Sequence, residues 1–222
     1  MVWVRQNSGP ARPDARLDKK RPVVLFCGMV TKGDETRERI LDRAMAMAAV
    51  VGLEGLSIGE LARETGMSKS GLFAHFASKE DLQLKIIETA RERFARDVFV
   101  PALRATRGET RVRALFERWL AWERGRVGGC PFVEASYELD DRPGRVRDAL
   151  AAVQSDWVDN IGKAVQMATD EGHFRADLDP RQFAYEMYGI FLAYHLYHRL
   201  LDAEDAAARA RVAFDRLVSA SR

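Results

Sequence analysis

The chain has 222 residues, of which 47% are hydrophobic, and a formal net charge of +2. This length allows one or two packed domains. The lack of a long apolar run excludes a membrane-spanning helix, and residues 23–26 are too short an apolar stretch for a signal peptide. Two cysteines, Cys27 and Cys130, are too few for a disulfide framework or a metal cluster. We therefore expect a cytoplasmic protein with no membrane partner, metal or cofactor.

Residues 1–33 contain three prolines, a basic cluster at residues 19–21 and no sustained hydrophobic period. This composition is typical of a disordered segment. Two interpretations of the segment stay open. A basic arm can enter the minor groove of DNA, or translation starts at Met29 and residues 1–28 are not made naturally. We favour the second interpretation.

Residues 57–67 have the pattern of a short helix that ends in a tight turn. Ser57 is a candidate N-cap, and Glu60 lies three positions later, where it completes a capping box. Gly66 can adopt the left-handed conformation that ends a helix, so that Gly66 and Met67 form the turn.

A second short helix follows the turn and is the predicted recognition helix. Ser68 is its candidate N-cap, and Leu72 and Phe76 are spaced to point inward. Ser78 is the candidate cap of a third helix, whose first turn is acidic. Two short helices joined by a tight turn, with a third helix behind them, predict a helix-turn-helix DNA-binding unit.

Residues 36–82 resemble the DNA-binding domain of the TetR family of one-component transcriptional regulators. The resemblance rests on these positions: Thr36, Arg37, Ile40, Gly55, Leu56, Ser57, Ile58, Leu61, Ala62, Gly66, Ser68, Lys69, Gly71, Leu72, Phe76, Lys79 and Leu82. It departs at Phe73, where the family usually has a tyrosine whose hydroxyl contacts a DNA phosphate. Phenylalanine cannot donate that hydrogen bond, and we interpret this as the loss of one positioning contact.

The resemblance implies an all-α protein with a helix-turn-helix domain at residues 34–80 and a larger effector-binding and dimerisation domain at residues 81–222. It also implies a homodimer that binds a palindromic operator in double-stranded DNA and is released by a small molecule. Repression is the expected outcome and activation the alternative. The competing hypothesis is a helical interaction protein of the same fold that has lost specific DNA binding. We do not expect an enzyme, because no phosphate-binding loop, nucleophile elbow or paired metal motif is present.

Eight residues are the candidate DNA contacts. Lys69, Ser70 and Gly71 stand at the start of the recognition helix, where they would face the bases, with Gly71 allowing the backbone to approach the groove. The phosphates would be contacted or flanked by Ser57, Ser68, Phe73, His75 and Lys79.

Beyond residue 81 the pattern is helical throughout. We expect helices at residues 82–100, with Pro101 as an interruption, and at 109–126, 132–139, from Pro143 to the stop at Gly172, 180–201 and 204–220. The helix at 183–201 is apolar or aromatic nearly all round, so we expect it to be covered by its own domain and by a second subunit.

The effector is the least determined feature. Seven aromatic residues are candidates to line an apolar cavity, although we expect most of them to be ordinary core: Trp119, Trp122, Phe132, Tyr137, Trp157, Phe191 and Tyr194. Cys130 is either a redox-sensing thiol or a buried inert one, and we favour the inert thiol. His195 and His198 lie three positions apart, but no second pair of ligands accompanies them, so we expect core or interface histidines and no metal site.

Overall fold

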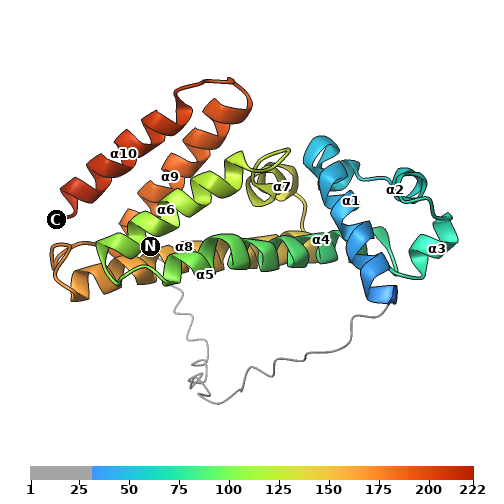
Figure 1. Cartoon of the computed structure of the whole chain (residues 1–222), viewed down its shortest axis with the longest axis horizontal. Helices are drawn as coiled ribbons and strands as arrows, with labels where there is room; N and C mark the ends of the chain where they lie inside the picture. The colour runs from blue at the N-terminus through green and yellow to red at the C-terminus, as the bar shows by residue number, and fades with distance from the viewer. Residues whose placement is uncertain (1–31) are drawn as a thin grey trace, which may run out of the picture. The chain divides into compact units, whose positions relative to one another are not determined.

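The computed structural model describes residues 32–222, so the predicted N-terminal arm and Cys27 lie outside the described residues. The described part is helical and contains no strand, as the sequence predicts (Figure 1). Its elements are α1 (Lys32–Gly55), α2 (Ile58–Glu64), α3 (Lys69–Phe73), α4 (Lys79–Phe94), the π-helix η1 (Ala95–Phe99), α5 (Val100–Leu103), α6 (Glu109–Arg124), α7 (Pro131–Leu139), α8 (Arg145–Asp170), α9 (Pro180–Arg199) and α10 (Ala206–Ala220).

Among the helices within residues 32–222, none combines the length and the apolar character needed to cross a membrane.

The three N-terminal helices share a small core with the start of α4. Ile40 of α1, Leu61 of α2, Leu72 of α3 and Leu82 of α4 are all at most 1% exposed. Phe76, which follows α3, is buried with them, as its spacing from Leu72 predicts. This shared core holds α3 in place, because its five residues are too few to be stable without packing.

The helical path from α4 into η1 confirms the predicted stripe of apolar residues four positions apart: Leu82, Ile86, Ala90, Phe94 and Val98 are all buried. Pro101, however, does not end the helical path, which runs on to Leu103. Proline lacks an N–H and its ring crowds the preceding turn. The chain accommodates it by widening that turn into the π-helix η1, where the Val100 N–H donates to the Ala95 carbonyl.

The C-terminal helices follow the predicted order with small shifts at their ends. Helix α6 ends at Arg124, two residues early, and α8 begins at Arg145 because Gly144, not Pro143, occupies the cap position. Helix α9 packs on α8 and on α10. Its inner face is buried, whereas Tyr185 is 73% exposed and Tyr197 is 43% exposed, so apolar residues do cover opposite sides of this helix.

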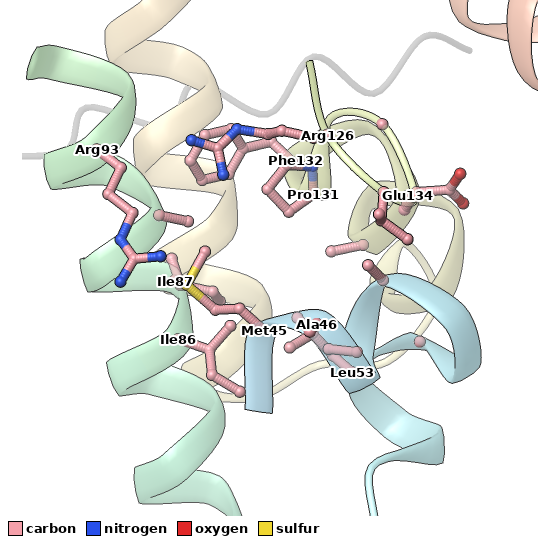
Figure 2. Close-up of a pocket in the computed structure, with 18 of the residues that line it drawn as sticks. Met45, Ala46, Leu53, Ile86, Ile87, Arg93, Arg126, Pro131, Phe132 and Glu134 are labelled. Atoms are coloured by element: carbon pink, nitrogen blue, oxygen red, sulfur yellow. The ribbon is translucent and has the colours of Figure 1, made fainter. Parts of the chain in front are cut away.

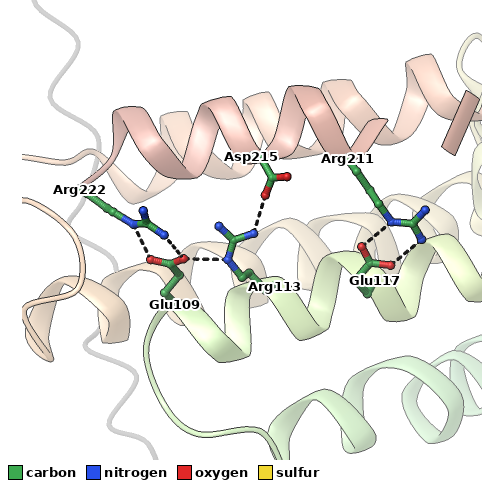
Figure 3. A network of polar contacts seen from close by, with 6 residues as sticks. All are labelled: Glu109, Arg113, Glu117, Arg211, Asp215 and Arg222. Atoms are coloured by element: carbon green, nitrogen blue, oxygen red, sulfur yellow. Dashed lines mark hydrogen bonds and ion pairs between the residues drawn. The ribbon is translucent and has the colours of Figure 1, made fainter. Parts of the chain in front are cut away.

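Charged side chains fasten α10 to α6 (Figure 3). Arg222 donates to Glu109 at 2.6 and 2.9 Å, and Arg113 donates to Glu109 at 2.7 Å and to Asp215 at 2.6 Å. The hydrogen bonds from Arg222, followed by those from Arg113, lower the pKa of Glu109 to about 2 despite its partial burial. A second pair joins Arg211 of α10 to Glu117 of α6 in bidentate geometry.

Candidate nucleic-acid interface and effector cavities

Helix α2 begins and ends as the sequence predicts. The Ser57 side chain accepts a hydrogen bond from the Glu60 N–H at 3.4 Å. At the other end, Gly66 has a φ of 68°. The Met67 N–H donates to the Ala62 carbonyl at 2.8 Å and the Gly66 N–H to that of Arg63 at 3.2 Å. This paired pattern is a Schellman motif, and it sets the angle at which the chain enters α3.

The Ser68 hydroxyl caps α3. It accepts a hydrogen bond from the Gly71 N–H at 3.0 Å and lies 3.0 Å from the Ser70 hydroxyl. The α-helix is shorter than expected, because it ends at Phe73 and only a turn continues toward Phe76. The cap keeps the start of α3 turned outward, where Ser68, Lys69 and Ser70 are exposed to solvent.

Four further candidate contacts, Phe73, Gly71, His75 and Lys79, differ in their exposure to solvent. Phe73 is 47% exposed, so it presents a bare ring where the resemblance implies a tyrosine hydroxyl. Gly71 and His75 are half-buried. Lys79 is also half-buried, and its Nζ donates to the Glu54 carbonyl at 2.5 Å, which ties the start of α4 to the end of α1. Lys79 thus already has a structural partner.

A contact that sequence reasoning missed joins the N-terminal helices to α7. The Glu138 carboxylate accepts hydrogen bonds from the N–H groups of Leu53 at 2.8 Å and Glu54 at 3.4 Å. From α4, the Gln83 amide donates to the Leu53 carbonyl at 2.9 Å. The end of α1 is therefore held from two sides, by Glu138 of α7 and by Gln83 of α4.

The structure does not bring the seven aromatic candidates into one cavity. Trp119, Phe132 and Trp157 line a cavity of about 100 Å³, which we call the inner cavity, together with Phe94, Phe99 and Tyr188. Trp122 and Phe191 are buried core residues. The remaining two stand elsewhere, because Tyr194 borders a groove between α9 and α10, and Tyr137 is 65% exposed beside α8.

Cys130 lies beside the inner cavity and is buried. Burial, followed by the nearby charge of Glu123, raises the pKa of its thiol to about 12. A thiol with such a pKa stays protonated at neutral pH, whereas a reactive sensor needs an accessible thiolate. This environment favours the inert thiol over the redox sensor.

His195 takes part in a charge cluster that the sequence analysis did not predict, with buried Glu123 on one side and exposed Glu134 on the other. Its Nδ1 lies 2.7 Å from a carboxylate oxygen of Glu123 of α6, and its Nε2 lies 3.0 Å from a carboxylate oxygen of Glu134 of α7. Burial lowers the pKa of His195, but the hydrogen bonds and charges of Glu123 and Glu134 outweigh burial and raise it overall. Both ring nitrogens face carboxylates, an arrangement that favours the imidazolium form of the histidine.

The two histidines do not form a metal site. His198, three residues after His195, stacks its ring on Tyr194 at 5.2 Å between ring centroids. Within residues 32–222, no group of three histidine, cysteine or acidic side chains is arranged to hold a metal ion.

Comparison with known proteins gives two family matches that together cover most of the chain. Residues 40–86 match the bacterial regulatory proteins of the tetR family, and residues 108–214 match the tetracyclin repressor-like C-terminal domain. A curated relative, the HTH-type transcriptional regulator AcrR of Shigella flexneri, is 35% identical over 57 residues, which are 26% of this chain and 26% of that protein.

Solved structures resemble the chain over nearly its whole described length. A TetR transcriptional regulator from Chloroflexus aurantiacus is 29% identical, with a TM-score of 0.74, over 85% of this chain and 94% of its own. AibR, solved in complex with isovaleryl coenzyme A and operator DNA, is 25% identical, with a TM-score of 0.65, over 81% of this chain and 98% of its own. The chain belongs to the TetR family of DNA-binding transcriptional regulators, which are not enzymes.

Proposed function

We propose that this regulator is a repressor that binds a palindromic operator as a homodimer and is released when a small molecule occupies its C-terminal domain. The observation that carries the proposal is the exposed start of α3, where Ser68, Lys69 and Ser70 stand outward on a capped and well-packed helix-turn-helix unit. A single recognition helix contacts few base pairs, so specific affinity requires two of them on one duplex.

The exposed apolar residues of α9 and α10 support the homodimer. Leu196, Tyr197 and Val212 are each between 43% and 52% exposed. The groove between the two helices is lined mostly by small and apolar side chains, with Glu186, Arg209 and Arg216 among them. An apolar surface of this kind is typical of an interface between subunits. A second copy packed there would place two α3 helices on one DNA molecule.

The inner cavity supports release by a small molecule. Its wall combines aromatic rings with the polar side chains of Gln154 and Tyr188, which hydrogen bond to each other at 2.7 Å. Its volume of about 100 Å³ is small for a ligand pocket, so an effector there must push the walls apart. Such a ligand favours a different shape of the domain and thereby weakens DNA binding. In the relative AibR, an acyl coenzyme A and operator DNA are bound to the same protein.

The test is a gel shift with the DNA upstream of the protein's own gene, carried out over a range of salt concentrations with nonspecific competitor DNA present. We expect a protein–DNA complex that persists in the presence of competitor DNA and whose affinity falls steeply as the salt concentration rises. A complex that forms only without competitor would favour a protein that has lost specific binding. A thermal-shift screen of lipophilic and aromatic compounds, followed by the same gel shift, then identifies effectors.

A further inference from the structure

A second cavity lies where α1 meets α4, α7 and the loop at residues 125–129, and its volume is about 290 Å³. We call it the seam cavity. Its walls are mostly apolar, and Figure 2 shows Met45, Leu53, Ile86 and Ile87 on the side formed by α1 and α4. It is distinct from the inner cavity, although Phe132 stands between the two and lines both.

Two guanidinium groups border this apolar space. Figure 2 shows Arg93 directed inward from α4 and Arg126 lying along the loop side beside Phe132, whereas the carboxylate of Glu134 points away from the cavity. Arg93 is paired with Asp42, and the carboxylates of Glu134 and Glu138 are occupied by His195 and by backbone N–H groups. The acidic residues around the cavity are therefore already engaged.

Of the two guanidinium groups that border the cavity, Arg126 has the weaker carboxylate partner. Its guanidinium carbon lies 3.3 Å from the centroid of the Trp122 ring, and its side chain is 25% exposed. Of the carboxylates in the described part of the chain, the one recorded in contact with it is Asp97, at 3.5 Å, and Asp97 already accepts hydrogen bonds from Arg96 at 2.7 and 3.1 Å. Burial lowers the pKa of Arg126, and the charge of Asp97 offsets this only in part.

A stacked, partly buried guanidinium with free donors is suited to bind an anionic group in bidentate geometry. We propose that the seam cavity binds a small organic anion, with its carboxylate or similar group on Arg126 and its apolar body between α1 and α4. The volume is at the low end for ligand pockets and therefore favours a short chain or a single ring.

The proposed site lies against α1, the first helix of the DNA-binding domain. The loop that carries Arg126 touches α1 at Gly128, where a Cβ would stand 2.5 Å from both the Cβ and the carbonyl oxygen of Ala49. Gly128 also has a φ of 82°, so a larger side chain there would separate the loop from α1. A ligand that fills the seam cavity would contact the loop, α4 and α1, because residues of all three line it.

Calorimetry without DNA tests the site independently of any operator. The probes are octanoate, octan-1-ol and octyltrimethylammonium, which share an apolar body and differ in charge. We expect octanoate to bind at least about tenfold more tightly than the other two, and Arg126→Gln to reduce its affinity to that of the alcohol. Octanoate binding no tighter than the alcohol, or no detectable binding of octanoate, would overturn the proposal.

Two further variants locate the bound anion. Arg91→Gln is the matched control, because Arg91 borders the inner cavity, and it should leave octanoate affinity unchanged. Ala46→Leu adds a larger side chain to the wall of the seam cavity at an exposed position on α1, and it should weaken octanoate binding. This variant tests the site independently if Arg126→Gln fails to fold. Loss of octanoate binding in Arg91→Gln, with full binding in Ala46→Leu, would place the anion in the inner cavity and refute the seam site.

Discussion

The carboxylate of Glu138 on α7 accepts a 2.8 Å hydrogen bond from the backbone N–H of Leu53 at the end of α1. This hydrogen bond joins the C-terminal domain to the helix-turn-helix domain through a carboxylate that accepts from main-chain N–H groups. The same carboxylate also faces the Glu54 N–H at 3.4 Å. Because α7 also carries Phe132, which lines both cavities, Glu138 offers one path by which a ligand in either proposed site would act on α1.

Glu138→Ala should therefore lower the stability of the folded protein. Removing the acceptor leaves two partly buried N–H groups without their carboxylate, and we expect a loss of about 1–3 kcal/mol in the free energy of unfolding. Denaturant titration measures this loss. Glu88→Ala is the control, because Glu88 forms an exposed ion pair with Lys85 on α4 and should cost less than about 1 kcal/mol. Equal losses in the two variants would contradict the assigned role of Glu138.

Local signals in the sequence predicted much of this fold. Ser57, Ser68 and Ser78 each accept the backbone hydrogen bond expected of an N-cap, and each marks the start of a helix within one residue. Such caps involve neighbours three positions apart, so a single sequence contains them. The resemblance to a known family supplied the order of the domains, which local patterns alone do not provide.

The contacts between residues far apart in the sequence could not be predicted in the same way. Glu138 and Leu53 are 85 positions apart, and His195 and Glu123 are 72 apart. A sequence shows the charge of each residue but not which distant partner the packing of helices brings to it. The aromatic candidates illustrate the same limit: Tyr137 and Phe132 lie on one short helix, yet one is 65% exposed and the other is buried.

Lys69→Ala should weaken operator binding while leaving the fold intact. Lys69 is exposed at the start of α3, with its stem against Gly59 of α2. Losing one cationic contact should cost about 1–3 kcal/mol of binding free energy. If that contact is to a phosphate, the slope of the logarithm of operator affinity against the logarithm of salt concentration should become shallower by about one. Gel shifts at several salt concentrations measure both effects. Lys163→Ala, which removes an exposed lysine from α8, is the control. Unchanged operator affinity in Lys69→Ala would remove Lys69 from the interface.

The His195 cluster predicts a pH-dependent contribution to stability. The pKa of His195 is raised in the folded protein, so the stabilisation it provides is complete below the unfolded pKa of about 6.5 and is lost as the pH rises through the folded value. His195→Asn should therefore destabilise the protein more at pH 6 than at pH 9, as measured by denaturant titration. His198→Asn, on the same helix, controls for general effects on α9. A difference from wild type that stays constant between these pH values would contradict the prediction.

Leu196→Glu should convert the proposed dimer into monomers. Leu196 is 45% exposed on α9, and an interface at α9 and α10 would enclose the new carboxylate without a partner, which costs several kcal/mol per subunit. Light scattering coupled to gel filtration measures the mass, and operator affinity should fall with it, because one subunit brings only one recognition helix to the palindrome. Val50→Glu, at a 75% exposed position on α1, should leave the dimer intact. If Leu196→Glu keeps the mass of a dimer, the subunits pair through a different surface.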